Sequence, residues 1–346
     1  MNRWLLSMLA VCAALGVAAA SAQTPATSPS PAPQTDAKKF PLAAPAGKDS
    51  KAREVAPAGA VNKGPFDAAK WKHGGAWNPP AGAKIWNPVK LKMMKGEKLV
   101  AGTIFHTTDP AVYCAMANAG YDFIFVEQQH SPRDWESVAR MWRTCPHAKA
   151  VPGVRVAYTD EREIQHALDA GALVIIVPTV DSVAEAIEAR NWTFFPPLGR
   201  RSNVMSAQSV SQAMWGGVPG GYRNTANDNI VLIEMIETLQ GLAEADKIAK
   251  VPGVSALFAA GNDLGNFSGF KPDSPDYERA INIVHDAAIK AGVRLCGPLA
   301  WLGRPDWTCF QAGTEVEAIA RGAAVELGSL ANTQAVPEVG PFAAPR

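Results

Sequence analysis

The sequence predicts a closed (β/α)8 barrel, the TIM-barrel fold of the α/β class. Apolar runs of strand length alternate with helix-like segments eight times between residues 91 and 331. These runs are apolar throughout, which is typical of parallel strands that helices cover. No glycine-rich nucleotide-binding turn follows the first run, which disfavours the competing open, doubly wound sheet. Eight such units over about 240 residues suit the usual size of this barrel.

The first half of the predicted barrel has four strands, each followed by a helix. Asp109-Pro110 and Gly120 bound the first helix, because an Asp cap, an early Pro and a closing Gly mark helix ends. Ser131 is expected to cap the second helix, with Pro132 just inside it. The predicted strands are 99–105, 121–126, 150–156 and 172–180, and the predicted helices are 109–120, 131–145, 159–171 and 181–190.

The second half follows a long polar excursion at 191–228. A Gly- and Asn-rich loop is expected after the sixth strand. The remaining predicted strands are 229–237, 254–261, 293–299 and 322–329, and the predicted helices are 238–250, 275–292 and a short one at 305–313.

The amino terminus is typical of a secretory signal peptide, predicted at residues 1–22. Arg3 precedes a short apolar core, and Ala20-Ser21-Ala22 is a cleavage signal of the small-residue type. The apolar core is short for a membrane span, although a retained anchor is the alternative. The mature protein is therefore expected to be periplasmic or secreted, with no membrane association after cleavage.

The segments that flank the barrel are expected to be irregular. Residues 23–65 are rich in Pro, Ala and Ser and are predicted to be a disordered linker, because they can bury little apolar surface. Residues 66–90 carry three tryptophans and are expected to form an irregular N-terminal arm. Residues 332–346 are a C-terminal tail.

Composition excludes some classes of protein and leaves the cysteines open. The net charge is +1 without a basic block, so nucleic acid is not an expected partner. No CxxC or HxxxH pair is present, so a thiolate zinc site is not expected. In an oxidising compartment Cys114, Cys145, Cys296 and Cys309 could form two disulfides in any of three pairings, or remain four buried thiols.

Polar residues gather where the predicted strands end, and in a barrel of this kind that end carries the active site. The second strand, in FIFVEQQHSP, runs directly into Glu127, Gln128, Gln129 and His130. Two late carboxylates can hold a hard divalent cation, an arginine can grip a substrate carboxylate, and a histidine can move protons near neutral pH. Together these groups suit enolate chemistry on a 2-oxo acid. The other candidates are Arg155, Glu234, Glu237, Asn262 and Asp263.

These residues resemble the HpcH/HpaI aldolases, metal-dependent pyruvate aldolases that have a (β/α)8 barrel. The resemblance runs from about Trp86 to Ala331 and rests on the order and spacing of its motifs. The motifs are NPVKLKMMKGEKLVAGTIF, AGYDFIFVEQQHSP, GVRV, LDAGALVIIVPTVDSVAEA, PPLGRRS, AND at 226–228, IET at 236–238 and AAGNDLG.

The resemblance implies a role for several residues. Glu237 and Asp263 match the family's metal ligands, for Mg²⁺, Mn²⁺ or Co²⁺. Arg155 matches the arginine that binds pyruvate and its enolate, and His130 matches the histidine of proton transfer. Asp169 matches a carboxylate that hydrogen-bonds this histidine.

The resemblance also bears on substrate contacts and on assembly. Gly261, Asn262 and Gln129 are expected to contact the substrate. The family is oligomeric, so a homo-oligomer is expected, a hexamer or trimer of dimers, with sites that can borrow residues from a neighbouring subunit.

Three departures from the family pattern alter the expected lining of the site. The family's Asp-Gly-Glu-His is Glu127-Gln128-Gln129-His130 here, and its Gly-Pro-Ala-Asp is Ala260-Gly261-Asn262-Asp263. Met235 stands where a relative has Gln. We therefore expect the enolate half of the reaction to be kept more faithfully than the specificity for the aldehyde.

The leading hypothesis is a class II aldolase that cleaves a 4-hydroxy-2-oxo acid to pyruvate and an aldehyde through a metal-stabilised enolate. A second hypothesis is a related carbon–carbon lyase whose substrate is bulkier or aromatic, with Met235, Trp215 and Tyr222 as its lining. A third is an exported, non-catalytic protein that binds a small carboxylate.

Overall fold

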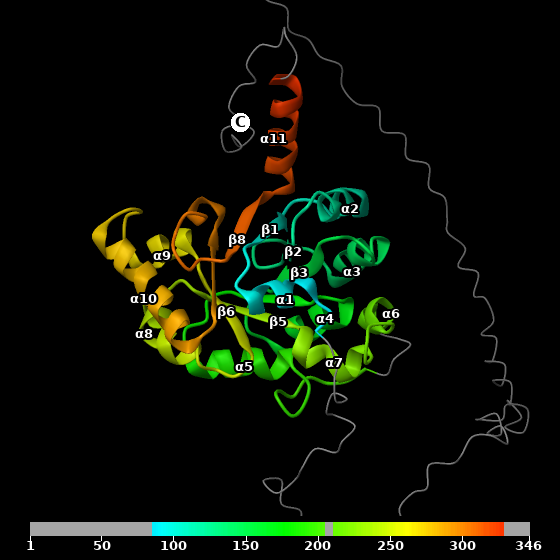
Figure 1. Cartoon of the computed structure of the whole chain (residues 1–346), viewed down its shortest axis with the longest axis horizontal. Helices are drawn as coiled ribbons and strands as arrows, with labels where there is room; N and C mark the ends of the chain where they lie inside the picture. The colour runs from blue at the N-terminus through cyan, green and yellow to red at the C-terminus, as the bar shows by residue number, and fades with distance from the viewer. Residues whose placement is uncertain (1–84, 205–209, 329–346) are drawn as a thin grey trace, which may run out of the picture. The chain divides into compact units, whose positions relative to one another are not determined.

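Eight parallel strands form a closed barrel in the computed structural model, which describes residues 85–204 and 210–328 (Figure 1). The strands pair in sequence order, and β8 pairs with β1 to close the sheet. The predicted (β/α)8 architecture is therefore confirmed. The strands are β1 Leu99–Ile104, β2 Phe123–Glu127, β3 Val151–Arg155, β4 Val174–Val177, β5 Val231–Ile236, β6 Val254–Ala259, β7 Arg294–Pro298 and β8 Cys309–Thr314.

Helices surround this sheet, and most begin at a side chain that caps them. Asp109, Asp160, Ser182, Thr238 and Ser274 each accept hydrogen bonds from main-chain N–H groups of the first turn. The helices are α1 Pro88–Lys95, α2 Pro110–Asn118, α3 Trp135–Thr144, α4 Glu161–Ala170, α5 Val183–Thr193, α6 Val210–Trp215, α7 Tyr222–Asn229, α8 Leu239–Ile248, α9 Gly261–Ser268, α10 Pro275–Ala291 and α11 Glu315–Gly328, with a 3-10 turn at Leu299–Trp301.

The strands are the core. Every residue of β2, β3, β4 and β5 is buried, as their continuous apolar character predicts. The short helix α1 lies at the amino ends of the strands, where Arg294 at the start of β7 donates to the carbonyl oxygens of Met93 (2.6 Å) and Met94 (2.9 Å). The opposite, carboxyl end of the barrel carries the candidate site residues His130, Arg155 and Asp263.

The sequence-based prediction of the last strand and last helix is wrong. Residues 322–329, predicted as the eighth strand, lie in α11 up to Gly328, and residue 329 lies outside the described residues. Residues 305–313, predicted as a short helix, contain most of β8. Closure explains the exchange, because Leu99 of β1 pairs with Cys309 and the sheet is complete before α11 begins.

Four smaller expectations are also corrected. α3 begins at Trp135 with Asp134 as its cap, so Ser131 and Pro132 lie in the preceding loop. The Gly/Asn loop after β6 is the helix α9. The polar excursion at 191–228 contains α6 and most of α7. Residues 88–90 of the arm, expected to be irregular, form the first turn of α1.

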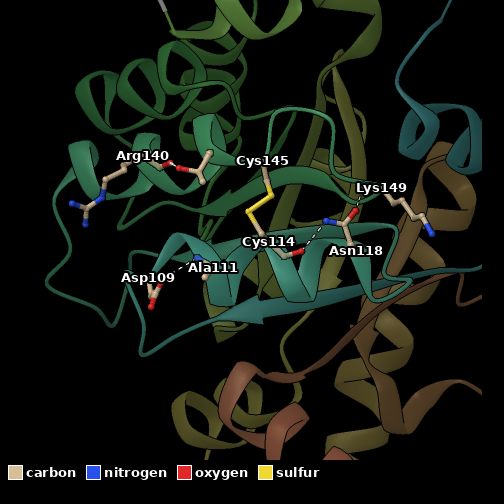
Figure 2. Close-up of a disulfide and its surroundings, with 8 residues drawn as sticks. Asp109, Ala111, Cys114, Asn118, Arg140, Cys145 and Lys149 are labelled. Atoms are coloured by element: carbon tan, nitrogen blue, oxygen red, sulfur yellow. Dashed lines mark hydrogen bonds between the residues drawn. A yellow bond between two sulfur atoms is a disulfide. The ribbon is translucent and has the colours of Figure 1, made fainter.

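One disulfide joins the outer helices next to β2 and β3. Cys114 of α2 bonds Cys145 at the end of α3, with 5.7 Å between their Cα atoms (Figure 2). Cys296 and Cys309 are free and buried, and they are paired residues of β7 and β8. Neither of the two cysteine alternatives holds completely, since one pair is bonded and the other is reduced.

The predicted signal peptide, the linker 23–65, most of the arm 66–90 and the tail 332–346 lie outside the described residues. Among the helices that are described, none is long and apolar enough to cross a membrane.

Candidate active site

A cavity of about 330 Å³ lies at the carboxyl end of the barrel. It brings together predicted residues that are distant in sequence, from the ends of β2, β3 and β6. Because all strands of this closed sheet are parallel, their carboxyl ends lie at the same rim of the barrel. The lining residues are His130, Arg155, Met235, Phe258, Ala260, Gly261, Asn262, Asp263, Pro298 and Gln311.

Arg155 is held by Glu127, the last residue of β2. The two residues are register partners on β2 and β3, and Glu127 is completely buried. Arg155 donates from Nε to Glu127 Oε2 (2.5 Å) and also forms an ion pair with it through Nη2. The third nitrogen, Nη1, lies 3.9 Å from the sulfur of Met235. This arrangement fixes the guanidinium plane at the cavity.

Glu127 also orders the loop that carries the histidine. Its Oε1 accepts from the main-chain N–H groups of Gln129 (2.7 Å) and His130 (3.2 Å). The same carboxylate therefore positions an arginine with one oxygen and a histidine with the other. The His130 side chain is exposed at the rim.

Glu237 and Asp263 lie close enough for the charge of Asp263 to act on Glu237. Burial, foremost, and the Asp263 carboxylate raise the pKa of Glu237, while hydrogen bonds from Thr179 and the charge of Arg155 oppose the rise. Glu237 Oε1 accepts from the N–H (2.7 Å) and hydroxyl (2.8 Å) of Thr179, whereas its buried Oε2 has no hydrogen-bond partner within the described chain.

These features fit a divalent cation. A buried carboxylate oxygen without a partner, beside a second carboxylate, suits a hard cation that takes oxygen ligands. No cluster of three or more His, Cys, Asp or Glu side chains able to hold a metal exists among residues 85–204 and 210–328. Water or substrate oxygens would therefore have to complete the coordination of a cation held by Glu237 and Asp263.

The amino end of α9 faces the cavity with Gly261, Asn262 and Asp263. Its N-cap residue, Ala260, makes no side-chain cap, so the first N–H groups of the helix have no capping side chain. Such an end attracts anions. Gly261 is required by packing, since a Cβ there would lie 2.5 Å from the hydroxyl of Tyr277, which itself donates to Gly261 O at 3.0 Å.

Asp169 is not brought to His130 within one chain. It is next to last in α4, which ends near the amino ends of the strands, where Leu173 N donates to Pro152 O. There Asp169 pairs with the buried Arg201 (2.7 Å). The hydrogen bond to His130 that the family resemblance implies stays a prediction, and it would need a second subunit.

Two glutamines flank the site without lining the cavity. Gln128 is buried and Gln129 is half-buried, and the side-chain oxygen of each lacks a hydrogen-bond partner within the described chain. Gln129 is absent from the cavity lining. Its predicted contact with substrate is not tested by this arrangement.

Thr179, which donates to Glu237, is a candidate site residue that was not predicted from the sequence. It directly follows Pro178 after β4, at the same rim as the other strand ends. Its φ of 49° is unusual for a β-branched residue, which is typical of a constrained functional position. The rule that found Arg155 and Glu237, a polar residue after an apolar strand, would have found Thr179 as well.

Three other residues considered from the sequence lie away from the cavity. Trp215 stacks on Trp86, with ring centroids 5.7 Å apart, and donates to Gly171 O (3.0 Å). Tyr222 accepts from Arg201 (2.9 Å). Glu234 is buried, and on β5 it faces away from the side that Met235 and Glu237 share.

Comparisons with known proteins agree on one family. Residues 104–322 match the family described as HpcH/HpaI aldolase/citrate lyase. A hydroxypyruvate/pyruvate aldolase from Paraburkholderia phytofirmans is 33% identical over 211 residues, covering 60% of this chain and 81% of that protein. A 2-dehydro-3,6-dideoxy-6-sulfogluconate aldolase from Pseudomonas putida is 32% identical, covering 59% and 80%.

Solved structures give the same result for the fold. A protein of the HpcH/HpaI aldolase/citrate lyase family from Burkholderia cenocepacia has a TM-score of 0.62 and 27% identity, covering 70% of this chain and 98% of its own.

Proposed function

The chain belongs to the HpcH/HpaI aldolase/citrate lyase family, and on that premise we propose that it is a metal-dependent lyase that cleaves a 4-hydroxy-2-oxo acid to pyruvate and an aldehyde. The observation that carries the proposal is that His130, Arg155 and Asp263 line the same cavity. Relatives of the chain are named aldolases that act on pyruvate, hydroxypyruvate or 2-keto-3-deoxy sugar acids, which supports a carbon–carbon lyase.

Glu237 and Asp263 would hold the divalent cation, Mg²⁺, Mn²⁺ or Co²⁺. When bound, the cation would act as a Lewis acid on the 2-oxo group of the substrate. The Thr179 bonds keep one oxygen of Glu237 occupied, so the other is left for this role.

Arg155 binds the 2-oxo acid and stabilises negative charge as it develops on the enolate oxygen. Hydrogen-bond donors stabilise developing negative charge most strongly when they are oriented in advance. Glu127 orients this guanidinium before substrate arrives. The uncapped N–H groups at the start of α9 suit the substrate carboxylate.

His130 moves the protons. In the cleavage direction it accepts the proton of the 4-hydroxyl group, the electrons of that O–H bond form the aldehyde C=O, and the C3–C4 bond breaks. The electron pair of the broken bond becomes the C2–C3 double bond of the enolate, and the π pair of the C2=O group moves onto its oxygen, which becomes the enolate oxygen. The enolate then takes a proton at C3 and leaves as pyruvate.

The rival with a bulky aromatic substrate loses two of its three supporting residues. Trp215 and Tyr222 pack elsewhere, so only Met235 remains in the lining. The third hypothesis, a non-catalytic carboxylate-binding protein, differs from the proposed lyase because it predicts ligand binding without turnover.

The experiment is proton exchange into the methyl group of pyruvate in D₂O with Mn²⁺ present. Exchange is expected with the unaltered protein, and Arg155→Ala or a chelator should abolish it. Arg140→Ala, which removes an exposed arginine on α3, is the matched control and should exchange normally. Saturable thermal stabilisation by pyruvate without exchange, whatever the metal, would favour the binding protein.

A further inference from the structure

A second cavity, of about 510 Å³, lies beside the first, and His130 lines both. Its walls are the loop after β1 and the loop after β2. The first loop contributes Phe105, His106 and Thr108 to the lining, and the second loop contributes Ser131, Arg133 and Asp134. Because the proposed proton carrier stands between the two spaces, the breaking C3–C4 bond would lie at their junction.

Glu315 fixes the first wall. Its buried carboxylate, at the start of α11, accepts from the main-chain N–H groups of Phe105 (2.8 Å), His106 (2.5 Å) and Thr107 (2.7 Å). Burial by itself would raise the pKa of Glu315, but these hydrogen bonds together outweigh burial and lower the pKa. The loop is therefore held by an ionised carboxylate.

Arg133 fixes the same loop from the other side. Its guanidinium donates to the carbonyl oxygens of Ile104 (3.4 Å), Thr107 (3.1 Å) and Phe105, and to Glu127 O (2.8 Å). The arginine thus joins the two loops, because its N–H groups donate hydrogen bonds to main-chain carbonyl oxygens of both. The cavity therefore has a preformed wall, and the positive charge of Arg133 faces main-chain carbonyl oxygens.

Three further lining side chains, those of Asp134, Thr108 and Ser131, favour an uncharged ligand that carries hydroxyl groups. Asp134 is ionised, since hydrogen bonds from Ser137 lower its pKa, and it is exposed in the lining. A ligand that carries its own carboxylate would meet this charge. The hydroxyls of Thr108 and Ser131 make no hydrogen bond within residues 85–204 and 210–328, so they are available to a ligand.

We propose that this cavity binds the aldehyde half of the substrate and selects a short, neutral hydroxyaldehyde, with Thr108 and Ser131 as its specificity residues. The inference rests on the proposed function. In the synthetic direction, the C2–C3 π pair of the pyruvate enolate forms the bond from C3 to the aldehyde carbon while the enolate oxygen restores the C2=O group. The π pair of the aldehyde C=O goes to the aldehyde oxygen, which takes a proton from His130. The hydroxyls of the aldehyde chain would then pair with Thr108 and Ser131.

The first test compares acceptors with the unaltered protein, Mn²⁺ and pyruvate. Glyceraldehyde is neutral and hydroxylated, propanal lacks the hydroxyls, and succinic semialdehyde adds a carboxylate. Glyceraldehyde is expected to exceed each of the others at least about tenfold in kcat/KM, the effect of one or two hydrogen bonds. Equal or better use of succinic semialdehyde, or of propanal, would overturn the inference.

The second test uses variants and a ratio within each variant. Thr108→Val and Ser131→Ala should each lower the ratio of kcat/KM for glyceraldehyde to that for propanal by about fivefold. Thr144→Val, at the end of α3 and outside both cavities, is the matched control and should keep the ratio. Thr108→Arg should move preference toward succinic semialdehyde. Unchanged ratios in all three cavity variants would contradict the assignment.

Pyruvate exchange distinguishes the two levels of failure. Absence of exchange in the unaltered protein overturns the aldolase and this inference together. Exchange combined with the wrong order of acceptors overturns the inference alone.

Discussion

Glu127 is a buried carboxylate that connects two parts of the proposed chemistry. One oxygen holds the Arg155 guanidinium and the other accepts the N–H groups of Gln129 and His130. Such an ion pair adds little net stability by itself, yet the loss of one partner leaves the other charge buried. Glu127 therefore acts as a positioning residue.

Glu127→Gln is expected to reduce pyruvate exchange by about 10- to 100-fold, the usual effect of losing a group that orients a ligand-binding side chain. The free energy of unfolding should fall by about 3 kcal/mol, because Arg155 keeps a buried charge. Exchange kinetics against pyruvate concentration and urea denaturation measure the two effects. Glu127→Asp keeps the charge and should recover part of the exchange; equal loss in both variants would argue against a charge-dependent role.

Glu234 is a second buried carboxylate, and it takes no part in the proposed chemistry. Neither of its oxygens has a hydrogen-bond partner within the described chain, and burial raises its pKa from 4.5 to about 8. Between these values the folded chain holds a proton that the unfolded chain releases. The free energy of unfolding should therefore decrease as pH rises through this window and level off above it.

Glu234→Leu should remove this dependence and stabilise the protein at pH 8 by about 3 kcal/mol relative to its effect at pH 5, since one pKa unit corresponds to about 1.4 kcal/mol. Denaturant titrations at several pH values, compared with the unaltered protein, measure the difference. Glu234→Gln keeps the size without the titration and should also flatten the curve. Parallel pH profiles for all three proteins would contradict the prediction.

At the scale of elements, the strands that have a clear local hydrophobic pattern could be predicted from the sequence. The first seven strands are apolar runs bounded by capping residues, and each is found where the pattern places it. The last strand was not, because TCFQAGT has two small residues and a Gln, whereas the segment of α11 around Val325 is more apolar. Only pairing of β8 with both β7 and β1 identifies it.

The same distinction holds for the site. His130, Arg155, Glu237 and Asp263 follow from strand ends and from resemblance. The grip of Glu127 on Arg155 depends on the β2–β3 register, which local sequence does not encode. Register is set by long-range packing, so a contact between a supporting residue and a substrate-binding residue on the next strand becomes visible only in the structure.

The disulfide links α2 to the end of α3 across 31 residues of chain. Cys114→Ala with Cys145→Ala should lower the free energy of unfolding by up to about 3–4 kcal/mol, because a loop of this length loses much entropy in the unfolded state when closed. Thermal denaturation with and without reductant measures the change, and reductant should have no further effect on the double variant. In the unfolded, unreduced mature protein, thiol titration should count Cys296 and Cys309 only.

At the scale of the whole molecule, α11 is a long helix that the rest of the described chain covers very little. Of its residues only Glu315 is buried, and Ile319 and Val325 are 63% and 76% exposed. Figure 1 shows the helix extending away from the barrel after β8. Apolar side chains on such a helix favour contact with another chain, which supports the proposal of a homo-oligomer.

Unaltered protein should have a mass in solution that is a multiple of the 36.6 kDa chain, less any cleaved signal peptide. Ile319→Glu with Val325→Glu should reduce that mass, because two charges would be desolvated at the interface. Size-exclusion chromatography with light scattering measures it. Ile289→Glu on α10, which is also exposed, is the matched control, and identical masses for all proteins would remove α11 from the interface.

Asp169 gives the proposed oligomer a testable role in the reaction. It lies at the far end of α4 from the rim, so a bond to His130 would have to come from a neighbouring subunit. His130→Ala and Asp169→Asn should each be nearly inactive alone. In mixed oligomers, sites that take His130 from one chain and Asp169 from the other are intact.

Refolding the two variants together should therefore recover about a quarter of the unaltered exchange rate if subunits assort at random in a symmetric oligomer. The matched control is a mixture of His130→Ala with Arg155→Ala. Those two residues line one cavity of one chain, so their mixture should recover nothing. A shared site cannot remain inactive once each chain supplies the residue that the other lacks. If mass spectrometry verifies mixed oligomers and neither mixture recovers exchange, Asp169 therefore acts within its own subunit or takes no part in the reaction.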